Sequence, residues 1–260
     1  MTSESRQDDA YVWIWLPGAT RPVVAGRLSH HDGNIVFNYG RSYLARLDRI
    51  AIYLPELPLV PGILPLPPGL AMPGAIRDAS PDAWGRRVIV NRTLGAKGAR
   101  ADAIELGELA YLLESGSDRI GALDFQSSAT VYAPRESCGT SLDALMHAAE
   151  RVERNLPLGP ELDLALLHGT SLGGARPKVL IDAPEAKSIA KFSASGDVHN
   201  VVKAEFVAMR LATAAGLNVA PVRLARAWQG RVHGRALRPG ACGRRLASAR
   251  HGLGADNFRA

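Results

Sequence analysis

A glycine-rich stretch that ends in a lysine is the part of the sequence best suited to chemistry. It runs Thr170-Ser171-Leu172-Gly173-Gly174-Ala175-Arg176-Pro177-Lys178. Paired glycines let backbone N–H groups approach an anion closely, and a following lysine adds positive charge suited to phosphate. It is not a Walker A loop, because Pro177 and Val179 flank the lysine where that motif has glycine and serine or threonine. The stretch is either a phosphate-binding loop or a structural turn that opens a hairpin.

A second lysine and a glutamate follow in an order typical of a kinase small lobe. Lys191 lies inside an apolar strand pattern, where a charged amine is costly unless it is paired. Glu205 falls in the first turns of the next predicted helix. In protein kinases a strand lysine holds the α- and β-phosphates, and a helical carboxylate positions that lysine. Two surface charges, on a strand edge and a helix flank, would also account for the pair.

The elements that must position these residues predict an α+β fold. Asp32-Gly33, between two β-rich runs, predicts a hairpin within a small antiparallel sheet over residues 11–57. Helices are expected from Pro81, with the Ser80 hydroxyl as the cap, as far as Gly95, from the capping box Asp102-x-x-Glu105, and from Ser141. The fold class is therefore a strand-rich subdomain with helices, followed by a smaller sheet and helix.

The smaller sheet is expected around the two lysines. Residues 177–181 and 188–192 predict two strands, and a strand is also expected over 219–224. A helix is expected between the strands at 188–192 and 219–224. It ends at Gly216, and its predicted buried face consists of Ala204, Val207, Ala208, Leu211 and Ala215.

Composition excludes several classes of protein. With 260 residues, 47% of them hydrophobic, the chain is long and apolar enough to bury a core. No stretch approaches the roughly 20 apolar residues of a membrane span, and residues 1–10 lack the apolar core of a signal peptide. Cys138 and Cys242 have neither disulfide-framework nor zinc-site spacing. We expect a cytoplasmic protein that has no metal site of its own and does not bind a membrane.

The net charge of +6 arises from the C-terminal segment. Residues 226–260 hold eight arginines and a single acid, Asp256, whereas residues 1–225 are nearly neutral. Like charges repel, and the scattered apolar residues form no periodic face, so we predict a disordered tail from about Trp228 onward. Its composition fits coding sequence read through a frame change or a degraded gene. A basic tail that binds nucleic acid is the competing interpretation.

Over about residues 11–225 the sequence resembles the HipA-type toxin kinases of bacterial type II toxin–antitoxin systems. The resemblance rests on the N-terminal strand segment and on three motifs in the family's order and spacing, RDASPDAWGR at 77–86, SDRIGAL at 117–123 and SLGGARPK at 171–178. The last motif matches the family's S-x-x-G-A-x-x-K loop. The combination is specific, although no single motif is.

The resemblance implies a Ser/Thr protein kinase that uses ATP and Mg²⁺. It also implies a DNA-binding antitoxin of HipB type as partner, with DNA reached through that antitoxin. Ser171 corresponds to the family's autophosphorylation site, and Lys191 to its strand lysine. Glu205 is a choice on physical grounds as the partner of Lys191. The expected cofactor-binding set is Gly173, Gly174, Ala175, Lys178, Lys191 and Glu205.

Motifs that the family carries after its small lobe have no counterpart here. They are a hinge with an R-F-D-R motif, a catalytic loop with an aspartate and an asparagine, and a metal-binding aspartate. The only acid after Glu205 is Asp256, whereas phosphoryl transfer needs one carboxylate for the hydroxyl and another for Mg²⁺. No catalytic residue is assigned, and the expectation is a truncated, catalytically impaired kinase. The alternative is a non-catalytic binding module associated with an antitoxin or with DNA.

The predicted organisation follows from these segments. We predict a flexible N-terminus over residues 1–10, a HipA N-terminal-like subdomain over 11–125, a connecting strand and helix over 126–163, a kinase small-lobe-like segment over 164–225, and the basic tail over 226–260.

Overall fold

The computed structural model describes residues 9–94, 106–119, 121–135, 141–159, 166, 170–171, 173–182, 187–226 and 232–237. The described chain divides into two compact units. The first holds residues 9–80 and most of 106–134, and the second holds 81–94 and the described residues from 135 onward. In the described ranges, no helix is long and apolar enough to cross a membrane.

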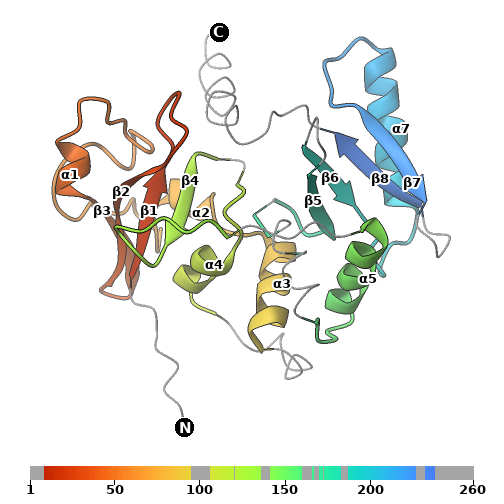
Figure 1. Ribbon diagram of the computed structural model, residues 1–260, viewed down its shortest axis with the longest axis horizontal. Helices are drawn as coiled ribbons and strands as arrows, with labels where there is room; N and C mark the ends of the chain where they lie inside the picture. Colours follow the sequence, from red (N-terminus) through yellow and green to blue (C-terminus); the bar gives the residue numbers. More distant parts are fainter. Residues whose placement is uncertain are drawn as a thin grey trace. The chain divides into compact units, whose positions relative to one another are not determined.

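The first unit is built on an antiparallel sheet of four strands (Figure 1). Its strand order is β3-β2-β1-β4, with β1 (Asp9–Ile14), β2 (Val23–His31), β3 (Asn34–Tyr39) and β4 (Leu123–Gln126). The hairpin predicted at Asp32-Gly33 is confirmed, because these residues join β2 to β3 with φ angles of 48° and 78°. Helices α1 (Arg41–Leu44), α2 (Gly74–Arg77) and α4 (Glu108–Glu114) accompany the sheet, and the core includes Phe37, Tyr43, Ile76, Leu112 and Phe125.

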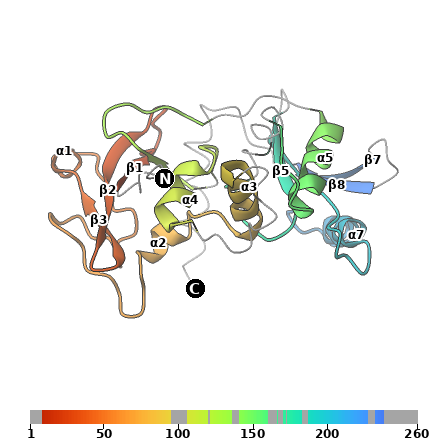
Figure 2. The same ribbon diagram turned by 90° about the horizontal axis from the view of Figure 1, so that it is seen from below.

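The second unit contains a sheet of four strands in the order β5-β6-β8-β7. The strands are β5 (Lys178–Asp182), β6 (Lys187–Lys191), β7 (Val222–Arg226) and β8 (Val232–Leu237), and the helices are α3 (Ala83–Leu94), α5 (Leu142–Glu153) and α7 (Val201–Ala214). Helix α7 packs along β7 and β8, as both views show (Figures 1 and 2). A core around Trp84, Met146, Val179 and Phe192 joins α3 and α5 to β5 and β6. The predicted α+β class is confirmed.

Of the three helices predicted in the middle of the chain, only the one that begins at Ser141 starts as expected. The Ser141 hydroxyl accepts a hydrogen bond from the Ala144 N–H at 3.2 Å and so caps α5. Helix α4 begins at Glu108, after Gly107 rather than at the predicted capping box, and it buries Leu109, Leu112 and Leu113. The capping box Asp102-x-x-Glu105 and the expected stop at Gly95 lie outside the described residues.

Helix α3 begins later than the sequence predicts. The Ser80 hydroxyl does not cap it but donates to Glu108 Oε2 at 3.2 Å. The first helical residue is Ala83, and the Asp82 carbonyl accepts from the Arg86 N–H at 2.9 Å. The prediction was wrong because Asp82, and not Ser80, directly precedes the first helical residue. Both are common capping residues, so local sequence does not distinguish them.

The predicted buried face of α7 is also wrong, although the stop at Gly216, with φ of 79°, is confirmed. All five residues of that face are exposed, Val207 at 53% and Leu211 at 65%. The helix instead buries Val202 and half-buries Phe206 and Met209. Apolar side chains lie on both sides of this helix, so its periodicity alone does not decide which side faces the sheet.

The predicted disorder of the C-terminal segment requires a correction at residues 232–237. These residues form β8, which pairs with β6 on one side and β7 on the other. Hydrogen bonds to two neighbouring strands compensate for the weak apolar character of the segment, and composition does not report such partners. Apart from Arg226, which ends β7, the rest of the basic tail lies outside the described residues.

Candidate functional site

The glycine loop, residues 170–178, leads into β5 and folds around the amine of Lys178. Gly174 has φ of 108°, a conformation that L side chains rarely adopt. A Cβ at Gly174 would lie 2.7 Å from Lys178 Nζ, and this amine donates to the Gly173 carbonyl oxygen. Glycine is therefore required at position 174 by its backbone conformation.

The start of α3 contacts this loop through Asp82 and Trp84. The Gly174 N–H donates to Asp82 Oδ2. Trp84 Nε1 donates to the Lys178 carbonyl oxygen at 3.0 Å, and the Trp84 N–H to the Gly174 carbonyl oxygen at 3.4 Å. Two of the motifs found in the sequence are thus structural partners, although about 90 residues separate them.

Gly85 extends this contact by allowing backbone to approach backbone. A Cβ at Gly85 would lie 2.2 Å from the Thr170 carbonyl oxygen, far inside van der Waals contact. From the sequence, the motif at 77–86 indicates a helix start and contributes to the family resemblance, but this packing role was missed. A glycine next to a tryptophan within a helix was the available signal, since such a glycine often marks close packing.

A bidentate ion pair holds the other end of the glycine loop. Arg176 donates through Nη1 and Nη2 to the Asp197 carboxylate at 2.8 and 2.6 Å, and Asp197 also accepts from the Ala194 N–H at 3.0 Å. The Arg176 hydrogen bonds hold the pKa of Asp197 below its usual range. The loop is therefore fixed to the turn that precedes α7.

Lys191 lies beside Lys178, because the two residues are paired across β5 and β6. Its amine donates to the Glu205 carboxylate on α7, and the two side chains are 33% and 40% exposed. Lys178 is only 6% exposed, so burial lowers the pKa of its amine, and repulsion from Lys191 lowers it further. Asp82 acts in the opposite direction on the same amine.

The structure thus brings together the residues that the sequence nominated. Gly173, Gly174 and Ala175 lie in the loop above Lys178, and the Lys191–Glu205 pair lies on the neighbouring strand and helix. Ser171 is half-buried at the start of the loop. The arrangement can offer backbone N–H groups and two amines to an anion, whereas the identity of that anion stays a prediction.

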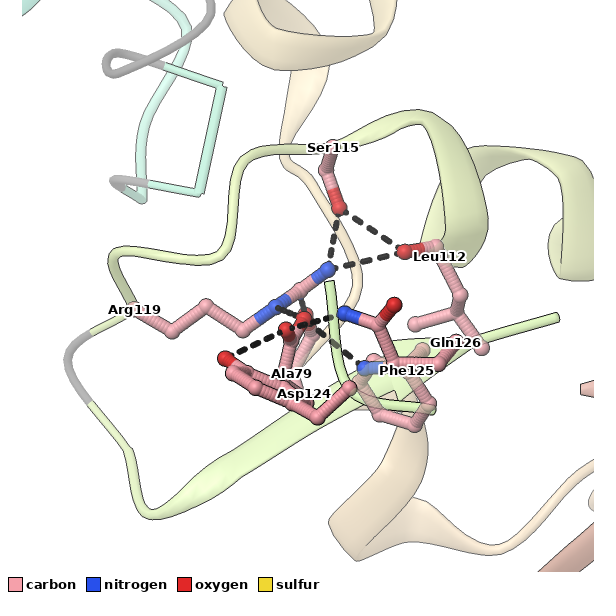
Figure 3. Close-up of polar contacts among 8 residues, drawn as sticks. Ala79, Leu112, Ser115, Arg119, Asp124, Phe125 and Gln126 are labelled. Carbon is pink, nitrogen blue, oxygen red and sulfur yellow. Dashed lines mark hydrogen bonds and ion pairs between the residues drawn. The ribbon is translucent and has the colours of Figure 1, made fainter. Parts of the chain in front are cut away.

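The motif at 117–123 has a structural role in the first unit. Arg119 lies against Asp124, with Nε 3.3 Å from Oδ1, and the two side chains are 4% and 0% exposed (Figure 3). Its guanidinium also donates to the Ala79 carbonyl oxygen at 2.7 Å and to the Leu112 carbonyl oxygen at 2.8 Å. This buried cation ties the residues after α2 to α4 and β4.

Comparison with known proteins agrees with this architecture. The family model of the HipA N-terminal domain matches residues 14–126, and that of the HipA-like C-terminal domain matches residues 170–235. No curated protein matches the chain. Among solved structures, the chain is similar to one from Shewanella oneidensis MR-1, described as the toxin–antitoxin system HipA, HipB and its operator DNA complex. The identity is 19% and the TM-score 0.42, and the match covers 83% of this chain and 48% of that one, about half its length. Because both HipA domain models match, in order and over more than half of the sequence, the chain belongs to the HipA family.

Proposed function

We propose that the chain forms the nucleotide-binding part of a HipA-type Ser/Thr protein kinase of a toxin–antitoxin system. The observation that supports this most is the site in the second unit. A glycine loop, a buried lysine beneath it and a lysine–glutamate pair on the adjacent strand and helix lie together within a chain of this family. This is the combination by which kinase small lobes hold nucleotide phosphates.

The residues present fit the phosphates of ATP. Gly173 and Gly174 are exposed in the loop, and Lys178 and Lys191 occupy paired positions on the neighbouring strands β5 and β6. A polyphosphate beside Lys178 would offset the cost of burying that amine. Mg²⁺ in such sites is held mainly by the phosphates with one or two carboxylates, and we assign no residue of this chain to it.

We propose no catalytic residue for phosphoryl transfer. Asp256 is the only acid after Glu205, and transfer needs two carboxylates in different roles. The expected behaviour of these 260 residues is weak ATP binding without transfer, so Ser171 should stay unmodified after incubation with ATP and Mg²⁺. Mass spectrometry of the peptide that contains Ser171 measures this directly.

A HipB-type antitoxin is the proposed partner, with DNA reached through it. Family membership supports this assignment. Co-purification with a HipB-type antitoxin tests it, and a salt-resistant complex is the expected result.

Calorimetry with ATP tests the nucleotide site. We expect Lys191→Met to weaken binding at least about tenfold, because it removes an amine that contacts phosphate. Methionine keeps the apolar stem, and the partly exposed ion pair contributes no more than about 1 kcal/mol, so stability should change little. Lys203→Met, an exposed lysine of α7, is the matched control. ATP binding that is tight and insensitive to Lys191→Met would contradict the proposal.

A further inference from the structure

Asp82 lies where the glycine loop would receive an anion. Its Oδ2 accepts the hydrogen bond of the Gly174 N–H, and the same oxygen lies 3.0 Å from the position of a Cβ on Gly173. The carboxylate therefore rests against the backbone of both glycines. An anion from the protein itself occupies the N–H group that a phosphate oxygen would need.

The charges around the loop are balanced within the protein. Asp82 raises the pKa of Lys178 against the effect of burial, so its carboxylate is close enough to stabilise the protonated amine. Lys191 has a closer partner, because its amine donates to the Glu205 carboxylate. A carboxylate of the protein therefore acts on each of the two amines. A polyphosphate at the Gly174 N–H would therefore be repelled by the negative charge of Asp82.

We propose that Asp82 is an intramolecular competitor of phosphate, an autoinhibitory contact between the start of α3 and the glycine loop. The inference rests on the proposed function and adds a control on the same site. To bind phosphate, the loop must exchange the carboxylate for a phosphate oxygen at the Gly174 N–H.

The local structure allows this exchange without rearrangement of the backbone. Asp82 is exposed and precedes the first residue of α3, so its side chain can rotate into water. Trp84 and Gly85 hold the helix against the loop through contacts that do not involve the Asp82 carboxylate. Rotation of one side chain would leave the loop in position with its N–H group available.

Titration of the full chain with inorganic tripolyphosphate and with ATP tests the proposal. Asp82→Asn keeps the shape and the acceptor oxygen but removes the charge, and we expect both ligands to bind about 10- to 100-fold more tightly, the range of one charged hydrogen bond. Asp78→Asn removes an equal charge from an exposed residue of the first unit and should leave both affinities unchanged. If Asp82→Asn does not fold, Asp82→Ser also removes the charge and carries the same expectation.

The outcomes separate this inference from the proposed function. Unchanged or weaker binding by Asp82→Asn, in a chain whose ATP binding still depends on Lys191, overturns the inference and leaves the proposed function standing. Tighter binding that is lost again in Asp82→Asn/Lys191→Met supports both. No binding by either the original chain or Asp82→Asn overturns both.

Discussion

The buried amine of Lys178 should make stability depend on pH in a characteristic direction. Burial, with repulsion from Lys191, lowers the pKa of Lys178 below 10.5. Between its pKa in the folded chain and 10.5, the unfolded chain binds more protons at this site than the folded one. The contribution of Lys178 to the free energy of unfolding therefore rises with pH across that window. Below the folded-state pKa, the free-energy cost of burying the charged amine is fully present.

Lys178→Met tests this dependence. We expect the free energy of unfolding of the variant, relative to the original chain, to be most favourable near neutral pH and to decline as pH approaches 10.5. Urea unfolding at several pH values measures the difference. Burial raises the pKa values of Tyr39 and Tyr43, so both proteins lose stability above pH 10 and the difference removes that effect. A difference that stays constant with pH would contradict the assignment.

Individual site residues could be predicted only where the residue would be energetically unfavourable in its local sequence without a partner. A lysine in an apolar strand is expensive alone, which pointed to a partner, and the structure places Glu205 against Lys191. Asp82 carried no such signal. An aspartate at the start of a helix has an ordinary explanation as a cap, and its contact with Gly174 spans 92 positions.

At the scale of elements, the close approach of α3 to the glycine loop gives a sharp test. In an exposed helix, Gly85→Ala would gain about 1 kcal/mol from helix propensity. Here the new Cβ would lie 2.2 Å from the Thr170 carbonyl oxygen and 3.0 Å from its carbon. Backbone cannot yield as a flexible side chain can, so we expect a net loss of about 1–3 kcal/mol. Thermal unfolding measures it.

Gly196→Ala is the matched control. Gly196 is exposed in the turn before α7, its φ is not positive, and nothing lies within 4 Å of its potential Cβ. Stability should change by less than about 0.5 kcal/mol. Equal losses at both glycines would show that the contact between α3 and the loop is not specific.

The elements themselves were more predictable than their packing. Turn chemistry at Asp32-Gly33 and the cap at Ser141 depend on neighbouring residues and were confirmed. Which side of α7 faces the sheet depends on the shape of the sheet, and both sides of that helix carry apolar residues. Local periodicity therefore located the helix but not its orientation.

At the scale of the molecule, each compact unit has its own core. A substitution that destabilises one core should therefore accelerate hydrogen exchange in that unit and not in the other. Arg119→Met leaves the fully buried Asp124 without its cation, and a broken buried pair costs about 3–5 kcal/mol. Gln126 and Tyr132 still donate to that carboxylate, which favours the lower end of the range. Hydrogen exchange should accelerate in β1 and β4 and stay unchanged in β5 and β6.

Arg27→Met is the control for this experiment. Arg27 pairs with Asp9 at 3.3 Å, but both side chains are at least 40% exposed, so the loss should be below about 1 kcal/mol. Accelerated exchange in β5 after Arg119→Met would contradict independent stability of the two cores.

Two deletions separate the role of β8 from that of the residues after it. β8 lies between β6 and β7 in the sheet, so its removal should affect both neighbours. Deletion of residues 232–260 removes β8, the strand that pairs with β7 within the described sheet and one of two strands against which α7 packs. We expect faster hydrogen exchange in β7 and α7. Deletion of 238–260 keeps every described strand pair and removes five of the eight arginines of residues 226–260, so exchange should not change. Identical exchange in both deletions would show that β8 does not stabilise the sheet.

The shorter deletion also tests the nucleic-acid interpretation of the tail. Salt-dependent DNA binding that is lost when residues 238–260 are removed would favour that interpretation.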